Sequence, residues 1–174
     1  MSSTTSSRGN PSMGDILRSV GVIGVIILAV WGFGKIFTTD PGDPVKPVDY
    51  AQVVQQARPA ASFELLAPSS LPAGWRANVA QFEPDAWRLG VLTDQDEYIG
   101  LNQLKVSVDR ALARYAEGSK AAGTAQVAGE TWTVRSGPKG RWTYVRTEGG
   151  LTTLLNGTAS RPVIERYISS LSAG

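Results

Sequence analysis

Two aromatic side chains and one arginine alternate along a predicted strand near the carboxyl end of the chain. Trp142, Tyr144 and Arg146 are spaced two apart, which places them on one face of a strand over residues 141–147. An aromatic and basic strip of this kind can stack on a sugar ring or bind an anionic head group. The alternative is that Trp142 and Tyr144 pack in the core, with Arg146 at its rim. Both alternatives stay open, so these three residues are candidate contacts for a ligand or partner.

One amide side chain lies in phase with apolar residues on another predicted strand. Gln103 follows Ile99 and Leu101 at intervals of two, so it shares their inward face. A buried amide needs hydrogen-bond partners. Gln103 can therefore contact a ligand, or it can bind backbone groups at a bulge or a helix end, and it is the fourth candidate contact.

The densest group of carboxylates is Asp94, Asp96 and Glu97. An Asp-x-Asp pair can begin a calcium-binding loop, but an EF-hand needs a ligand at the fifth position and glycine at the sixth. This chain has Tyr98 and Ile99 there. The group therefore predicts a solvated hairpin turn, and we expect no metal site and no cofactor.

The chain contains neither cysteine nor histidine. Disulfides, thiol catalysis, Cys/His zinc sites and imidazole acid–base catalysis are therefore excluded. The sequence also lacks the Gly-x-x-x-x-Gly-Lys-Ser/Thr phosphate loop and a strand-linked Gly-x-Gly-x-x-Gly dinucleotide motif. We expect a protein that is not an enzyme and has no catalytic residues.

The net positive charge of the chain lies in its amino-terminal part. The formal charge is +2, and from Asp40 onward 14 Lys and Arg residues meet 14 Asp and Glu residues. Nucleic-acid binding draws most of its affinity from phosphates neutralised by basic side chains. A neutral domain without a basic stripe therefore predicts no nucleic-acid partner.

A long apolar stretch lies between Arg18 and Lys35. The sixteen residues between them carry no charge, and a helix extended to Phe37 is roughly 28 Å long, close to the ~30 Å hydrocarbon core of a bilayer. We predict a single-pass transmembrane anchor over residues 13–37. Because no A-x-A-like cleavage site follows it, an uncleaved signal anchor is favoured over an export signal.

The charges on either side of the predicted span suggest its orientation. Arg8 and Arg18 outnumber the one acidic residue before the apolar stretch, Asp15, which favours a cytoplasmic amino terminus and an extracytoplasmic carboxyl-terminal domain in the cell membrane. The polar composition of residues 1–12 predicts a disordered cytoplasmic tail. Residues 38–61 predict a Pro-rich spacer and a short helix over 50–57, with Asp49 as its cap.

Residues 62–174 show short β-type runs separated by turn residues, followed or interrupted by two amphipathic helical patterns. Strands that are joined by a tight turn, such as Gly149-Gly150, pair antiparallel. An amphipathic helix buries its apolar face against another element, and here the sheet provides that surface. The predicted fold is therefore α+β: one N-terminal transmembrane helix followed by an antiparallel sheet covered by about two helices. Strands are predicted over 63–66, 75–82, 87–91, 98–105, 125–128, 130–136, 141–147 and 151–156, and helices over 108–117, with Ser107 as its cap, and over 161–171.

Several short motifs follow the predicted span in a fixed order. They are Leu71-Pro-Ala-Gly-Trp75, Trp87-Arg-Leu-Gly-Val-Leu-Thr93, Tyr98-Ile-Gly-Leu-Asn-Gln103, Val127-Ala-Gly-Glu-Thr-Trp132 and Gly157-Thr-Ala159. Together with the span, they resemble the actinobacterial single-pass membrane proteins catalogued as domain of unknown function 4245. The resemblance covers nearly the whole chain. It implies a cell-envelope protein whose domain lies outside the cytoplasm, and it implies no activity and no catalytic residues.

An anchor, a stiff spacer and a neutral domain favour a membrane-tethered binding or accessory domain of the cell envelope, with an envelope protein as a possible partner. A tethered carrier of a small ligand or lipid, with a pocket between the sheet and the helices, is the second hypothesis. An envelope hydrolase that uses carboxylates alone is the third, and it requires two acidic side chains to converge in a cleft. Its candidates are Asp94, Asp96, Glu97, Asp109 and Glu130.

Overall fold

The computed structural model of the protein describes residues 47–173. The predicted tail over 1–12, the predicted transmembrane anchor over 13–37 and the start of the spacer lie outside these residues. Among the residues that it describes, no helix is both long and apolar enough to span a bilayer. The chain divides into two units, and the described residues belong to the second, which begins at Val45.

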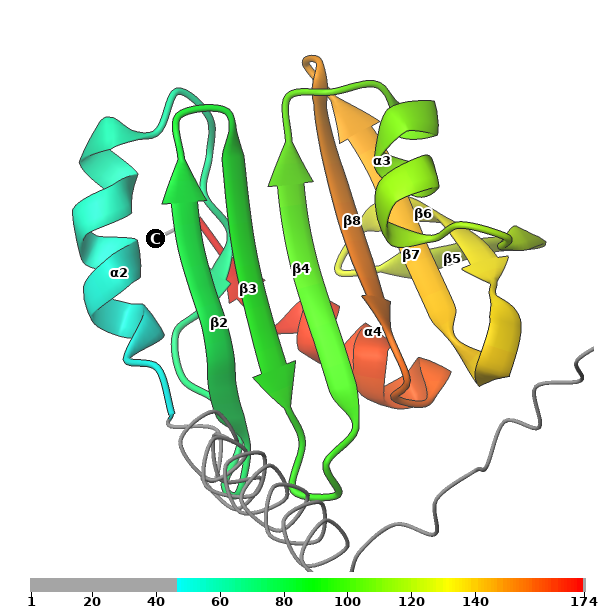
Figure 1. Ribbon diagram of the computed structural model, residues 1–174, viewed down its shortest axis with the longest axis horizontal. Coiled ribbons are helices and arrows are strands. Elements are labelled where there is room, and N and C mark those ends of the chain that lie inside the picture. The colour runs from blue at the N-terminus through cyan, green and yellow to red at the C-terminus, as the bar shows by residue number, and fades with distance from the viewer. Residues whose placement is uncertain (1–46, 174) are drawn as a thin grey trace, which may run out of the picture. The chain divides into compact units, whose positions relative to one another are not determined.

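A seven-stranded antiparallel sheet forms the centre of this unit (Figure 1). Its strand order is β2-β3-β4-β8-β7-β6-β5, so strands β2 to β4 form one half, strands β5 to β8 form the other, and the β4–β8 pair joins them. The α+β class with an antiparallel sheet is therefore confirmed. The strands are β2 (Arg76–Glu83), β3 (Ala86–Leu92), β4 (Tyr98–Leu104), β5 (Lys120–Val127), β6 (Glu130–Ser136), β7 (Trp142–Glu148) and β8 (Leu151–Gly157).

The described residues contain three α-helices, where the sequence predicted about two over the sheet. They are α2 (Tyr50–Ala57), α3 (Val108–Tyr115) and α4 (Arg161–Ser169). Helix α2 is the short helix expected in the spacer, and its Asp49 cap accepts a hydrogen bond from the Gln52 N–H. Because α2 buries Val54 and Ala57 in the core, the unit includes residues ahead of the boundary expected at Ser62.

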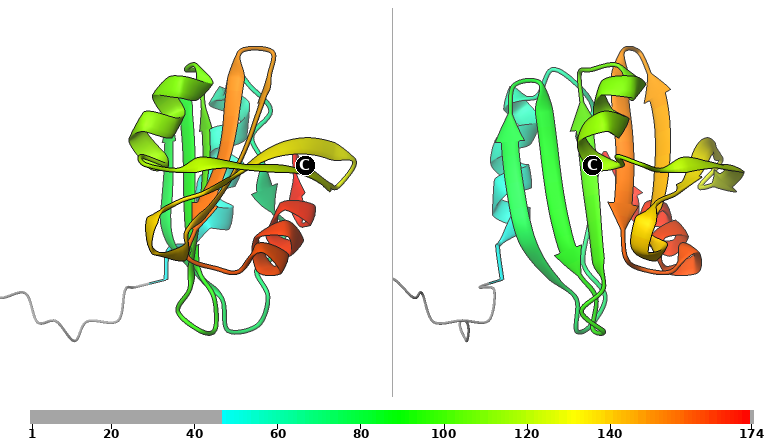
Figure 2. Two further views of the ribbon diagram at one scale, coloured as in Figure 1. Left: turned by 90° about the vertical axis from the view of Figure 1, so that its right-hand side faces the viewer. Right: turned by 45° about the vertical axis from the view of Figure 1, so that its right-hand side comes forward.

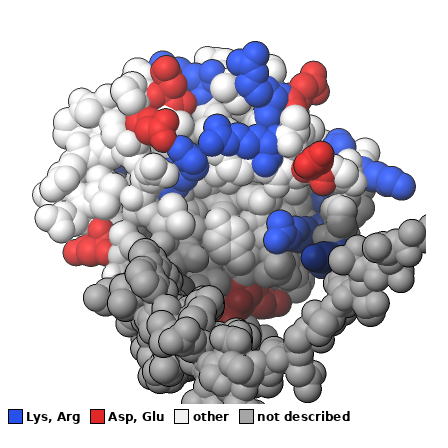
Figure 3. Space-filling view, viewed as in Figure 1, with Lys and Arg blue, Asp and Glu red and all other residues white. Residues whose placement is uncertain are grey.

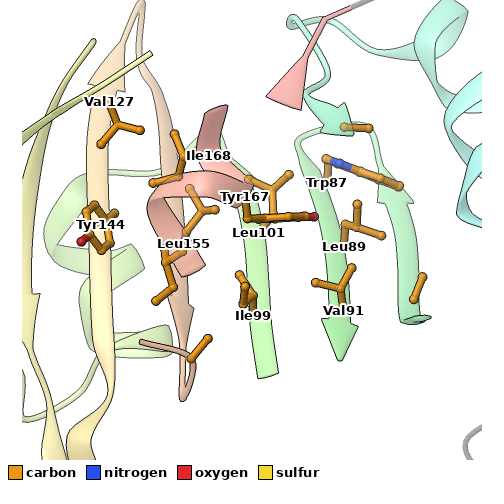
Figure 4. Close-up of a cluster of buried hydrophobic side chains, with 14 of the residues drawn as sticks. Trp87, Leu89, Val91, Ile99, Leu101, Val127, Tyr144, Leu155, Tyr167 and Ile168 are labelled. Atoms are coloured by element: carbon orange, nitrogen blue, oxygen red, sulfur yellow. The ribbon is translucent and has the colours of Figure 1, made fainter. Parts of the chain in front are cut away.

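One face of the sheet carries the main hydrophobic core. Alternate residues of each strand point to this face, as the two-residue period of a strand requires. Helices α2 and α4 and the small sheet of β1 (Ala67–Pro68) and β9 (Leu171–Ser172) supply the other side of this core. Buried members of this core that Figure 4 draws include Trp87, Leu89, Val91, Ile99, Leu101, Tyr144, Leu155, Tyr167 and Ile168.

Helix α3 covers part of the opposite face of the sheet (Figure 2). Ser107 caps this helix by accepting a hydrogen bond from the Arg110 N–H, as predicted. A second, smaller cluster forms where Ala111 of α3 meets Leu104, Val145 and Leu154. The sheet therefore separates a large core on one side from a single covering helix on the other.

The strand predicted over residues 63–66 does not form, and the short strand β1 begins one residue later. The reason is that the backbone of residues 63–66 forms hydrogen bonds with side chains rather than with another strand. Gln103 binds Glu64 and Leu66, and the Trp87 Nε1–H donates to the Leu66 carbonyl (2.9 Å).

Other boundaries also differ from the sequence prediction, and α3 ends at Tyr115 rather than at Glu117. The strand predicted over 125–128 is longer, because β5 pairs with β6 from Lys120 onward across an irregularity that includes Gly123, at a φ of 105°. The last helix ends at Ser169 rather than at Leu171, because Ser170 binds the Tyr167 carbonyl through both its N–H and its hydroxyl. Leu171 then pairs with Pro68 in the β1–β9 sheet.

Gly157 lies at the end of β8, where the strands approach most closely. A Cβ at this position would lie 2.1 Å from the Tyr98 carbonyl oxygen, a distance that no side chain can adopt without backbone movement. Glycine is therefore required here, and the Thr158 hydroxyl next to it accepts a hydrogen bond from the Tyr98 N–H (2.9 Å). This contact fixes the end of the β4–β8 pair.

Candidate functional site

Gln103 is buried, with 1% of its surface exposed, and its amide is used inside the protein. Its Oε1 accepts a hydrogen bond from the Leu66 N–H (2.8 Å), and its Nε2–H donates to the Glu64 carbonyl (3.0 Å). The sequence left two alternatives open for Gln103: contact with a ligand or contact with backbone groups. The observed hydrogen bonds are to backbone groups. Gln103 attaches the 63–66 segment to the sheet.

Trp142 and Tyr144 pack in the main core, as the core alternative for this strip predicted. The Tyr144 hydroxyl donates to Glu165 Oε1 (2.6 Å) and accepts from the Arg161 Nε–H (3.2 Å). Burial, followed by the hydrogen bond to Glu165, raises the pKa of Tyr144 to about 12. Arg161 also lies over the Trp142 ring, 5.2 Å from its centroid, so this group joins β7 to α4.

Arg146 lies at the rim of the core and is engaged on several sides. Its guanidinium lies 5.3 Å from the centroid of the Trp132 ring, and it pairs with Glu130 (2.8 Å) and Glu148 (3.6 Å). Arg146 and Gln103 line one shallow cavity of about 310 Å³, whereas Trp142 and Tyr144 do not. The structure therefore brings together two of the four predicted residues, and both already have internal partners.

A larger recess lies on the opposite face, at the carboxyl end of α3. Its volume is about 380 Å³, and we call it the basic recess. Its walls are the end of α3, the connection between β6 and β7, and strands β7 and β8. The residues that line it include Arg114, Tyr115, Lys139, Arg141, Thr143 and Asn156.

Three cations and one carboxylate line the basic recess: Arg114, Lys139, Arg141 and Glu117. Among the described residues, the three cations form no ion pair; the pairs that do form involve Arg76, Arg88, Lys105, Arg146 and Arg161. Figure 3 shows the face viewed in Figure 1, where basic side chains lie over the upper centre and the right-hand side, with acidic side chains among them. A domain whose charges balance overall thus concentrates unpaired positive charge at one hollow.

Hydrogen bonds beneath the basic recess fix its walls. The Asn156 Nδ2–H donates to the Tyr115 carbonyl (2.9 Å) and so ties the last turn of α3 to β8. Arg135 donates to both the hydroxyl (2.9 Å) and the carbonyl (2.6 Å) of Ser119, which holds the connection that follows α3. The hollow is therefore built into the fold.

Tyrosines lie beside this site without complete hydrogen bonding. The Tyr115 hydroxyl is buried and has no hydrogen-bond partner among the described residues. Burial, followed by the proximity of Tyr115, raises the pKa of Tyr98, and Arg141 opposes that rise. The two electrostatic influences on the pKa of Tyr98, from Tyr115 and Arg141, come from residues that line the basic recess.

The sequence prediction did not identify the basic recess. From the sequence, residues 137–140 are only a turn, and Arg141 lies on the strand face opposite Trp142. One available signal was that Arg135, Lys139 and Arg141 lie within seven residues without an intervening carboxylate. The convergence of Lys139 and Arg141 with Arg114 depends on the packing of α3 beside β8.

The fold and this site define an α+β domain with a basic recess between one helix and the sheet. A family model described as "Protein of unknown function (DUF4245)" matches residues 8–171, and the chain belongs to this family. The family resemblance stated from the motifs is thereby confirmed. None of the curated proteins compared with the chain matches it.

The role of Gln103 predicts a cost for its replacement. In Gln103→Leu, the Leu66 N–H and the Glu64 carbonyl lose their partner, the buried Gln103 amide, so we expect the free energy of unfolding to fall by about 1–3 kcal/mol. Gln81→Leu changes an exposed strand glutamine in the same way and should cost less than about 0.5 kcal/mol. Chemical denaturation of the full chain measures both, and equal costs would contradict the role assigned to Gln103.

The raised pKa of Tyr144 predicts a loss of stability at alkaline pH. An unfolded tyrosine ionises near pH 10, whereas folded Tyr144 ionises at about 12, so between these values the unfolded state releases its proton first. The stability from this residue is complete below pH 10 and is lost as the pH rises toward 12. Between pH 10 and 12, Tyr144→Phe should release about one proton fewer on unfolding than the wild type, so its free energy of unfolding should fall less steeply with pH. Chemical denaturation at several pH values measures this slope, and equal slopes for the two proteins would refute the raised pKa of Tyr144.

Proposed function

We propose that this protein is a membrane-anchored member of the cell envelope whose described domain lies outside the cytoplasm and binds another envelope component. The observation that carries the proposal is the basic recess, since Arg114, Lys139 and Arg141 form no ion pair among the described residues. Ligand sites are typically concave, of about 300–1,000 Å³, with a few convergent polar groups. The predicted single span supplies the anchor.

Binding without catalysis fits the arrangement of the carboxylates better than hydrolysis does. A carboxylate hydrolase needs two acidic groups that face one substrate. Asp96 in the β3–β4 turn, which also holds Asp94 and Glu97, pairs with Arg76, and Glu130 at the start of β6 pairs with Arg146. Asp109 lies on α3, so Asp96, Glu130 and Asp109 belong to three separate elements.

A small-ligand carrier is a second candidate, favoured by the position of the basic recess between α3 and the sheet. The larger interface, between the sheet and helices α2 and α4, is occupied by buried side chains such as Trp87, Leu101 and Tyr167. A carried ligand would therefore bind through a polar or charged group at α3. A lipid held by its acyl chains fits this lining less well.

The proposed topology can be tested by placing single cysteines in a chain that has none. Ala113 is exposed on α3, and Ala113→Cys should react with a membrane-impermeant maleimide in intact cells. Ser3→Cys, in the predicted cytoplasmic tail, is the matched control and should react only after lysis. The reverse pattern would refute the proposed orientation.

The proposed binding role predicts co-purification of an envelope component from native membranes in mild detergent. The tagged full-length protein and a version with an unrelated span should both recover the component at near-equal amount, because the contact lies in the outer domain. Arg114→Gln with Arg141→Gln should reduce recovery. Arg58→Gln with Arg166→Gln makes the same change of charge at exposed arginines outside the recess and should not.

Two results would contradict the binding role. If neither version brings down a component in near-equal amount, the domain is not the binding module proposed. If only the native span recovers it, the contact lies in the bilayer rather than at the basic recess.

A further inference from the structure

We propose that the basic recess binds a phosphate monoester group. The inference rests on the proposed binding function and adds the chemical class of the ligand. It follows from the charge of the lining, the donors that it offers and the way its walls are held.

The charge of the lining suits a doubly charged anion. Arg114, Lys139 and Arg141 against Glu117 leave two positive charges at the hollow. A phosphate monoester carries about −1.5 to −2 charges near neutral pH, whereas a carboxylate carries one. Because Arg114, Lys139 and Arg141 form no ion pair among the described residues, an anion here does not have to displace an internal carboxylate from them.

The donors are of the kinds that bind phosphate oxygens. Two guanidinium groups can each donate two parallel hydrogen bonds, and the lysine adds a compact charge. The Asn156 amide and the Thr143 hydroxyl, from adjacent strands, add neutral donors at the sheet side of the hollow. The exposed arginines can therefore approach the anion from the rim while the strands bind it from below.

The walls of the basic recess are held before any ligand arrives. Asn156 and Arg135 fix the segment from Tyr115 to Ser119 through the hydrogen bonds described above. The β6–β7 connection is set by Lys139 and Gly140, both with positive φ, and by the Gly137 N–H, which donates to the Arg141 carbonyl (2.7 Å). A preformed hollow lowers the entropic cost of binding.

The test is a titration of the full-length protein in dodecyl maltoside, a detergent without phosphorus, followed by phosphorus NMR. Glycerol 1-phosphate is the soluble probe, and phosphatidic acid added to the micelles presents the same monoester on a lipid. We expect saturable broadening of the probe signal. Arg114→Gln with Arg141→Gln should weaken binding at least about tenfold, because hydrogen bonds to the charged group are lost.

Arg58→Gln with Arg166→Gln is the control, since it removes the same charge from exposed sites outside the basic recess. Thermal unfolding of both double variants should match that of the wild type, because all four arginines are exposed. Binding of glycerol phosphate identifies a soluble ester as a sufficient ligand, and binding of phosphatidic acid alone identifies a lipid head group; both support the proposal. Absence of binding by both probes, or equal weakening in the two double variants, would overturn it.

The two proposals fail separately. If the envelope component still co-purifies through the recess but neither phosphate probe binds, only the ligand class is wrong. If a phosphate probe binds but no component is recovered from membranes, the phosphate site stands and the wider envelope-binding function does not.

Discussion

The pairing of β4 with β8 is the constraint on which the rest of the domain depends. It joins two half-sheets that are distant in sequence: Asn102 and Asn156, 54 positions apart, bind each other across it. The pair is buried on both faces, with Leu101 opposite Leu155 in the main core and Leu154 under α3. Close approach at Gly157 sets its end, because only a glycine admits the Tyr98 carbonyl there.

This pairing also creates the proposed site. Helix α3 lies in the chain between the two half-sheets, so joining them brings α3 over β7 and β8. Asn156 serves both purposes, since its Oδ1 accepts from Asn102 and its Nδ2 holds the end of α3. The basic recess is thus a consequence of how the sheet closes, and its cations come from both sides of that closure.

The two faces of the sheet use polar groups in opposite ways. On the core face, the polar side chains that suggested chemistry are satisfied internally: Gln103 by backbone, Tyr144 by Glu165, and Arg146 by two carboxylates. A buried polar group without a hydrogen-bond partner lowers the stability of the fold. These side chains are therefore bonded inside the protein, which makes them the least available to a ligand. On the α3 face, by contrast, the three cations of the basic recess stay exposed and form no ion pair among the described residues, which makes this recess the better candidate for binding.

The sequence alone determined the α+β class, most strands and helices, and the family. Period-two and helical patterns, caps such as Asp49 and Ser107, and glycine turns act over a few residues, so they can be identified from neighbours in the chain. The tertiary structure decided the strand order, the short β1–β9 pair and the basic recess. These depend on contacts between distant segments: Gln103 binding residues 64–66, Leu171 pairing with Pro68, and Arg114 meeting Lys139 and Arg141. No local sequence pattern encodes these long-range contacts, because they follow from the free energy of packing the whole sheet.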